Sequence, residues 1–220
     1  MADQKVGRVA GALLVVALLA ASACIKEDNT VTLFVDANGQ VVWSVLERNV
    51  RSDAKDRDER LTEEQQFIVA ARVHQHPAMT GLQRLAATNI KDSILQDKPP
   101  YTVLTEGQFT SLEAMGRRLL NVYGMTGTSV VSRDAEKWIW TLTLEYVPED
   151  VSDQDAAELT ALFGDHLHVA LREGEFIDAD GFSINEDKRL AELAGNPFEP
   201  RDRNDPPKKI TLTWRPLKRP

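Results

Sequence analysis

The four histidines of the chain form two His-x-His pairs, His74 with His76 and His166 with His168. Because side chains alternate along a strand, His166 and His168 project to the same side of the strand that we expect to contain them. Two imidazoles at this spacing can bind zinc or copper, and Asp165 offers a carboxylate beside them. A metal site needs three or four converging ligands, so the competing interpretation is two polar residues on the solvated face of a strand.

The pair His74 and His76 indicates a metal site less well. The helix that precedes it must end before Pro77, so the two side chains need not converge. A histidine in the last turn of a helix is also explained by the negative end of the helix dipole. A four-histidine site would form only if the two pairs met in space.

Motifs for other chemistry are missing from the sequence. It has no G-x-S-x-G elbow and no phosphate-binding glycine loop, and the Ser-x-x-Lys at Ser52–Lys55 lacks its companion motifs. The Asp-x-Asn-Gly at Asp36–Gly39 and the Asp-x-Asp-Gly at Asp178–Gly181 fit hairpin turns better than calcium loops. These observations favour a non-enzymatic protein.

The only cysteine, Cys24, ends a segment that has the pattern of a secretory signal. Lys5 and Arg8 give it a basic start, residues 9–23 are apolar, and small residues precede the cysteine. With its last four residues, Ala21-Ser22-Ala23-Cys24, the segment resembles the signal peptides of bacterial lipoproteins. Their lipobox ends in an obligatory cysteine, although leucine is most usual where Ala21 stands.

The resemblance implies that residues 1–23 are removed and that Cys24 is diacylated and usually acylated again, for example with palmitate. A retained membrane anchor is the first alternative, but a spanning helix needs about 20 apolar residues. A plain secretory signal is the second, but it would leave a lone thiol in an oxidising compartment. In similar lipoproteins, aspartate after the cysteine marks inner-membrane retention. Ile25 and Lys26 follow here, which implies the outer membrane if the organism has two membranes.

Composition limits the remaining function classes. The chain has 34 acidic and 26 basic residues, a formal net charge of −8, which argues against a nucleic-acid partner. Without a second cysteine, the fold depends on its apolar core. The length of the chain predicts a single domain, over 30–215. The polar residues before it predict a tether over 24–29, and the basic residues after it predict a tail over 216–220.

Hydrophobic periodicity predicts strands that cluster in hairpins, with helices between the clusters. The expected strands are 30–35, 41–50, 89–95, 101–105, 129–133, 138–146, 167–171 and 210–214, with an extended segment over 176–184. The expected helices start at the capping box Thr62–Gln65, at Pro77, at Ser111 and at Ser152 or Asp153, and a short one covers 186–194. The pattern predicts an α+β fold, an antiparallel sheet built from hairpins with amphipathic helices packed on one face.

We therefore expect a lipid-anchored protein of the bacterial envelope with a non-enzymatic binding or assembly role at the membrane surface. Its expected partners are the membrane, through the anchor, and other envelope proteins, without a cofactor. One alternative is a metal-binding or metal-dependent protein that uses His166 and His168 with zinc or copper. Another is a carrier of an apolar ligand, which would need a cavity beneath Trp138 and Trp140.

Overall fold

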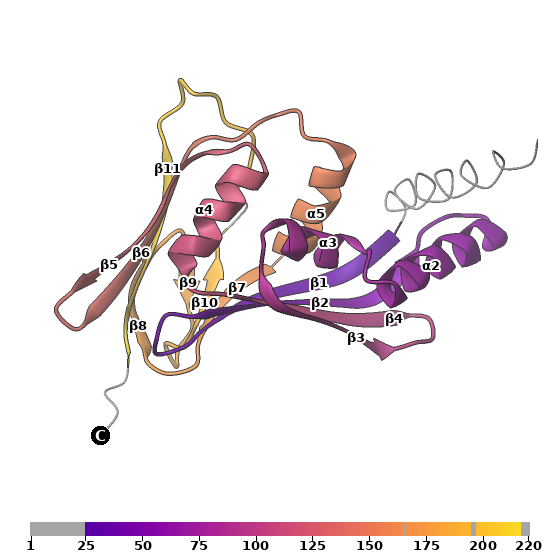
Figure 1. Ribbon diagram of the computed structural model, residues 1–220, viewed down its shortest axis with the longest axis horizontal. Coiled ribbons are helices and arrows are strands. Elements are labelled where there is room, and N and C mark those ends of the chain that lie inside the picture. Colours follow the sequence, from indigo (N-terminus) through magenta and orange to yellow (C-terminus); the bar gives the residue numbers. More distant parts are fainter. Residues whose placement is uncertain (1–24, 165, 195–196, 217–220) are drawn as a thin grey trace, which may run out of the picture.

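The computed structural model describes residues 25–164, 166–194 and 197–216, which form two β-sheets and four helices (Figure 1). The helices are α2 (Arg57–Arg72), α3 (Pro77–Arg84), α4 (Leu112–Val122) and α5 (Asp153–Phe163). The strands are β1 (Ile25–Val35), β2 (Val41–Ser52), β3 (Thr88–Gln96), β4 (Tyr101–Phe109), β5 (Thr126–Asp134), β6 (Lys137–Tyr146), β7 (His166–Leu171), β8 (Glu175–Asp180), β9 (Phe182–Ile184), β10 (Leu190–Leu193) and β11 (Lys208–Arg215).

The two sheets correct the expectation of a single antiparallel sheet. The larger has the order β3-β4-β2-β1-β7-β10-β9 and the smaller the order β5-β6-β11-β8. The smaller sheet is antiparallel throughout, whereas β1 and β7 run parallel inside the larger one. Alternation along a strand shows which face is buried but not which strand will be its neighbour, so the parallel pair was not predictable from the pattern.

The predicted hairpins and most helix starts are confirmed. Ser111 caps α4 and Ser152 caps α5 through their hydroxyl groups, and Gly164 follows the end of α5. Helix α2 begins earlier than expected, because the Asp56 carboxylate accepts hydrogen bonds from the amides of Asp58 and Glu59. Thr62 therefore lies within the helix.

Two other expectations are wrong. Residues 190–193 form β10 instead of a helix, and β10 pairs with β7 and β9. The segment 25–29 is not a tether but the start of β1, where Ile25 pairs with Ser52. Asn29 is buried there, and its side-chain amide donates to the carbonyl of Ala161 in α5 over 2.8 Å. This long-range contact was not visible in a short polar sequence.

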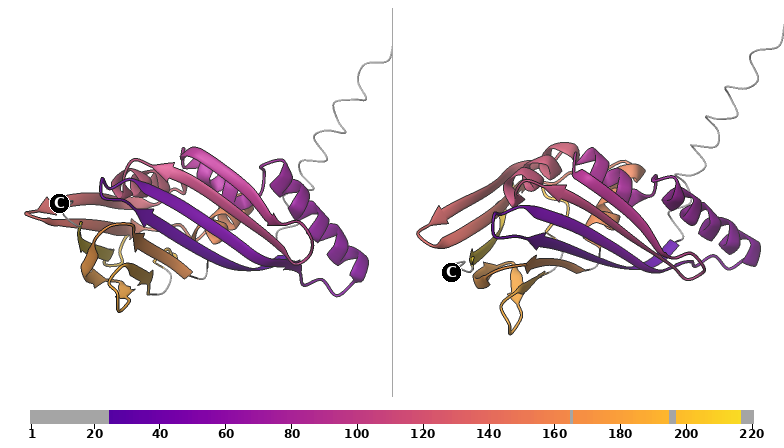
Figure 2. Two further views of the ribbon diagram at one scale, coloured as in Figure 1. Left: turned by 90° about the horizontal axis from the view of Figure 1, so that it is seen from below. Right: turned by 60° about the horizontal axis from the view of Figure 1, so that its bottom comes forward.

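One continuous core joins the two sheets. Trp43, Trp140 and Trp214 are buried in it, and the indole N–H of Trp43 donates to the carbonyl of Leu162 over 3.1 Å. Helices α3, α4 and α5 cover the same face of the large sheet (Figure 1). On the opposite face, which we call the outer face, the described residues place no helix (Figure 2, left).

Within the described residues, no helix combines the length and the apolar character needed to cross a bilayer.

Candidate functional site

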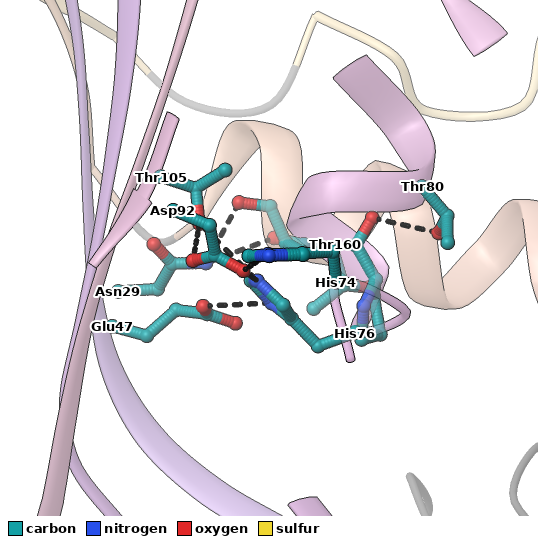
Figure 3. A network of polar contacts seen from close by, with 10 residues as sticks. Asn29, Glu47, His74, His76, Thr80, Asp92, Thr105 and Thr160 are labelled. Carbon is teal, nitrogen blue, oxygen red and sulfur yellow. Dashed lines mark hydrogen bonds and ion pairs between the residues drawn. The ribbon is translucent and has the colours of Figure 1, made fainter. Parts of the chain in front are cut away.

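A buried histidine occupies the junction between helices α2 and α3. The chain leaves α2 through His74, which has a φ of 58°, and His76 then becomes the N-cap residue of α3, before Pro77. This turn directs the His76 ring between two carboxylates (Figure 3). Its Nδ1 lies 3.2 Å from Oε2 of Glu47 in β2, and its Nε2 lies 3.0 Å from Oδ2 of Asp92 in β3.

Two more side chains complete this group, which we call the His76 cluster: His76, Glu47, Asp92, Thr105 and His74. The Thr105 hydroxyl donates to Oδ1 of Asp92 over 3.2 Å, and Nδ1 of His74 lies 3.3 Å from Oδ2 of the same carboxylate. The side chains of His76, Glu47 and Asp92 are 0%, 1% and 2% exposed, whereas that of His74 is 57% exposed. Only the edge of the cluster therefore contacts solvent.

The His76 cluster is held together by charge. Burial by itself would lower the pKa of His76, but attraction to Glu47 and a hydrogen bond to Asp92 outweigh it and raise the pKa to about 10. Burial would likewise raise the pKa of Asp92, but the hydrogen bond and the charge of His76 lower it. At neutral pH an imidazolium therefore lies between carboxylates.

The enclosure of the cluster limits what it can do. A general acid or base must come within about 3 Å of the group that it protonates or deprotonates. The ring of His76 has no contact with solvent. The ring of Phe67 packs edge-on against it, with 6.2 Å between the two ring centroids. The cluster is therefore suited to fixing the α2–α3 turn on the sheet.

The second histidine pair lies on the outer face. His166 and His168 project together from β7, opposite the buried Leu167 and Val169, as predicted. Their rings are parallel within 13°, with centroids 6.4 Å apart, and Nδ1 of His166 lies 2.9 Å from Oε1 of Glu192 in β10. Asp165 is outside the described residues. Among the residues that are described, no three His, Cys, Asp or Glu side chains are arranged to hold a metal ion.

The two histidine pairs do not meet. Val31, Val45 and Thr105 are directly paired across β1, β2 and β4, so they share the helix-covered face with Glu47 and the His76 cluster. His168 pairs with Thr32, whose side chain points to the opposite side from that of Val31. The sheet therefore separates the pairs, and a four-histidine site does not form.

A second buried polar group connects α3, α4 and α5. The Arg84 guanidinium donates to Oε2 of Glu158 and to Oδ1 of Asp155, both over 2.6 Å. The Tyr123 hydroxyl donates to the same Glu158 oxygen over 3.1 Å. Burial and the charge of Glu158 raise the pKa of Tyr123, so its phenol stays protonated. This group joins three helices above the large sheet.

A pocket lies near the predicted position of an apolar-ligand cavity. It has a volume of about 220 Å³ and is lined by the β1–β2 turn, the start of α4, Trp138 and Trp214. This volume is below the ~300–1,000 Å³ typical of small-molecule sites. Trp140 is 2% exposed in the packed core, where its indole N–H donates to Oγ of Ser129 over 3.0 Å.

Sequence reasoning missed the partners of His76, although one signal was present. Glu47 follows Val41, Trp43 and Val45 at alternating positions, so the pattern places a carboxylate on the buried face of β2. Such a carboxylate requires a cationic or hydrogen-bonding partner. The identity of that partner depends on tertiary contacts with α3 and β3.

Comparison with known proteins shows no matching family model and no matching curated protein. The folded domain of LppM from Mycobacterium tuberculosis, solved by NMR, is similar at 10% identity, over 89% of this chain and 92% of that one, with a TM-score of 0.40. The Fcho1 Mu homology domain of Danio rerio, solved with a bound Eps15 peptide, is similar at 7% identity, over 91% of this chain and 83% of that one, with a TM-score of 0.24. Neither likeness identifies a family for this chain.

Proposed function

We propose that this chain is a bacterial envelope lipoprotein, anchored through lipids on Cys24, whose domain has a non-enzymatic binding or assembly role at the membrane surface. One observation carries the proposal. The lipobox-like Ala21-Ser22-Ala23-Cys24 is followed directly by Ile25, the first residue of β1. A cleavage before Cys24 would thus remove the apolar segment and leave every strand of the described domain intact.

The outer face of the large sheet supports a binding role. Phe34 and Val42 are paired across β1 and β2, and Leu46 and Leu104 are paired across β2 and β4. All four side chains are partly exposed on a face that none of the helices α2 to α5 covers (Figure 2). Polar residues surround them, among them Thr30, Thr32, Arg48, Glu106, Gln108, His166 and His168. An apolar centre with a polar rim is typical of protein-binding surfaces.

The enclosure of the His76 cluster removes it from the candidates for acid–base catalysis. His76, whose pKa is strongly raised, is fully enclosed, whereas catalytic groups with shifted pKa values normally face a cleft.

The anchor is tested by expressing the whole chain in a bacterium that processes lipoproteins and measuring the mass of the purified product. We expect loss of residues 1–23 and a diacylglyceryl group on Cys24, usually with a further acyl chain. The Cys24→Ala variant should keep residues 1–23 and carry no lipid. A cleaved product with a free thiol at Cys24 would instead show a plain secretory signal, and an uncleaved wild-type product would show a retained anchor.

The binding face is tested with a photoreactive amino acid at Leu46 or Leu104 in the anchored protein. We expect a discrete crosslink to an envelope protein from both positions. Val130 is the matched control, because it is an exposed aliphatic residue on β5 of the other sheet. The same crosslinks from Val130, or none from Leu46 and Leu104, would contradict the assignment of this face.

The residues after the cysteine set the proposed location. Ile25 and Lys26 imply the outer membrane, facing the periplasm, in an organism with two membranes. Separation of the two membranes by density tests this, and Ile25→Asp should move the protein to the inner membrane.

Metal binding is the second candidate, because His166 and His168 project together from β7 and Asp165, the third expected ligand, comes directly before this strand in the sequence. Native mass spectrometry of protein purified without chelator tests it. A zinc- or copper-sized adduct that is absent from His166→Ala/His168→Ala would establish the site, and a bare mass in both would reject it.

A further inference from the structure

Helix α2 has an unusual outward surface. Leu61, Val69 and Val73 are 47%, 44% and 51% exposed. Val69 follows Leu61 after eight residues of α2, and Val73, the C-cap residue, follows Val69 after four. They are three of the six large apolar side chains that are exposed in the described part of the chain. Because residues four apart share one side of a helix, the three form a stripe on the outward side of α2, which also carries the exposed Gln65 and Arg72.

The acidic residues beside this stripe point toward the sheet. The Ser52 hydroxyl donates to Oε2 of Glu63, and the Ser52 amide donates to Oε1 of Glu64 over 3.2 Å. Exposed helices normally show charged residues to solvent and apolar residues to the core. The part of α2 that follows Leu61 therefore has apolar side chains on its outward side as well as on the side that packs on the sheet, where Ile68 and Ala71 are buried.

The stripe lies close to the start of the described chain. Ile25 pairs with Ser52 in β2, the residue that Glu63 and Glu64 bind. Ile25 also packs on the small apolar cluster of Val50, Ile68 and Tyr101, which lies beneath α2. Cys24 comes directly before Ile25 in the sequence. No flexible segment separates the lipidation position from the domain.

We propose that this end of the domain rests on the bilayer and that Leu61, Val69 and Val73 contact lipid. The inference depends on the proposed lipid anchor, since lipids on Cys24 would hold α2 against the membrane. The apolar side of a helix lying in a membrane interface is buried by about 5–10 Å. The acidic and basic residues of α2 nearly cancel, so apolar contact, rather than attraction to anionic headgroups, would dominate.

The test uses the lipidated protein in vesicles of phosphatidylethanolamine and phosphatidylglycerol. Because Cys24 is the only cysteine and its sulfur would be bonded to lipid, an introduced cysteine is the only free thiol. A polarity-sensitive fluorophore is attached to Val69→Cys, Val73→Cys or Val130→Cys. Val130 is a close control, a valine that is 48% exposed but lies on β5. Mass spectrometry of each sample first establishes that Cys24 carries lipid.

We expect the emission maximum of the fluorophores at positions 69 and 73 to shift to shorter wavelength in the vesicles. When the acyl chains carry nitroxides, which quench fluorescence, these fluorophores should lose most of their emission. The fluorophore at position 130 should change little, and high salt should not restore the emission at 69 and 73. No shift at 69 and 73 in protein of the correct lipidated mass would overturn the docking while the anchor stands. A shift without quenching would mean that protein, such as a second copy, covers the stripe. A mass without lipid on Cys24 would refute the anchor, and the docking with it.

Discussion

Nδ1 of His76 lies 3.2 Å from Oε2 of Glu47, and neither side chain reaches solvent. The two belong to a turn between helices and to an inner strand of the large sheet, so their contact fixes the position of the α2–α3 junction. Because Asp92 binds the other ring nitrogen, the imidazolium lies between two buried carboxylates.

Replacing His76 with leucine should destabilise the protein by about 3–5 kcal/mol, because it leaves two carboxylates buried without their cation. The free energy of unfolding in urea measures this effect. His74→Leu is the matched control. Its side chain is largely exposed and contacts the cluster only through Asp92, so it should cost less than about 1 kcal/mol. Equal effects of the two substitutions would show that the enclosure of His76 does not matter.

The stability of the wild-type protein should fall between about pH 6.5 and pH 10. His76 has an ordinary pKa of 6.5 when unfolded and about 10 when folded, so in this range the folded state binds more protons than the unfolded state. The contribution is complete below pH 6.5 and is lost as the pH rises through 10. Urea unfolding at several pH values measures it, and the alkaline slope should be much smaller in His76→Leu. A slope unchanged by the substitution would contradict the assignment.

Acid should destabilise the protein through Asp92. Its pKa is lowered in the folded state from an ordinary value of 3.8, so its contribution is present above that pH and is lost as the pH falls further. Unfolding measured on the acid side should show a smaller pH dependence in Asp92→Asn than in the wild type. The same substitution should leave the pH dependence between pH 5 and pH 6 almost unchanged, because Asp92 is ionised there in both the folded and the unfolded state.

Replacing Glu158 with alanine should cost about 1–3 kcal/mol, because the Tyr123 hydroxyl then loses its acceptor in a buried place. Asp155→Ala is the control, since Asp155 accepts from the same Arg84 nitrogen at a more exposed position. Its loss should cost less than about 1 kcal/mol. Thermal or urea unfolding distinguishes the two, and a larger effect at Asp155 would contradict the importance of the buried contact.

Gly116 allows α4 to approach β5 closely. A Cβ atom at this position would lie 2.6 Å from Cβ of Ser129, so Gly116→Ala should destabilise the protein by about 1–3 kcal/mol. In a Ser129→Gly background the same substitution should cost less, because the opposing atoms are gone. A double-mutant cycle of unfolding free energies measures the difference, and simple additivity would show that the helix shifts to accommodate the methyl group.

The sequence predicted local structure well where one pattern was long enough. The alternation of Trp138 to Tyr146 defined a strand that was confirmed as β6, and Ser111 with the apolar positions of α4 defined a helix. Shorter segments were ambiguous. Residues 190–193 are too few to distinguish the two-residue period of a strand from the 3.6-residue period of a helix. Their pairing with β7 decides their conformation.

The candidate site was less predictable than the fold. The pattern placed His166 and His168 correctly on one side of a strand, but it gave no sign that Glu192 lies beside them, because Glu192 was expected in a helix. His76 was interpreted as a residue near a helix end, whereas the charges that bind it come from distant strands. Such contacts depend on the order of the strands in the sheet, which local patterns do not encode.

The parallel pairing of β1 with β7 has a consequence for biogenesis. The ribosome makes β1 first among the described strands and can pair it early with β2, but its other edge stays open until residues 166–171 have been synthesised. Unpaired edges in the middle of an incomplete sheet invite intermolecular pairing. A chain truncated before β7 would therefore present β1 as an open sheet edge that can pair with another chain.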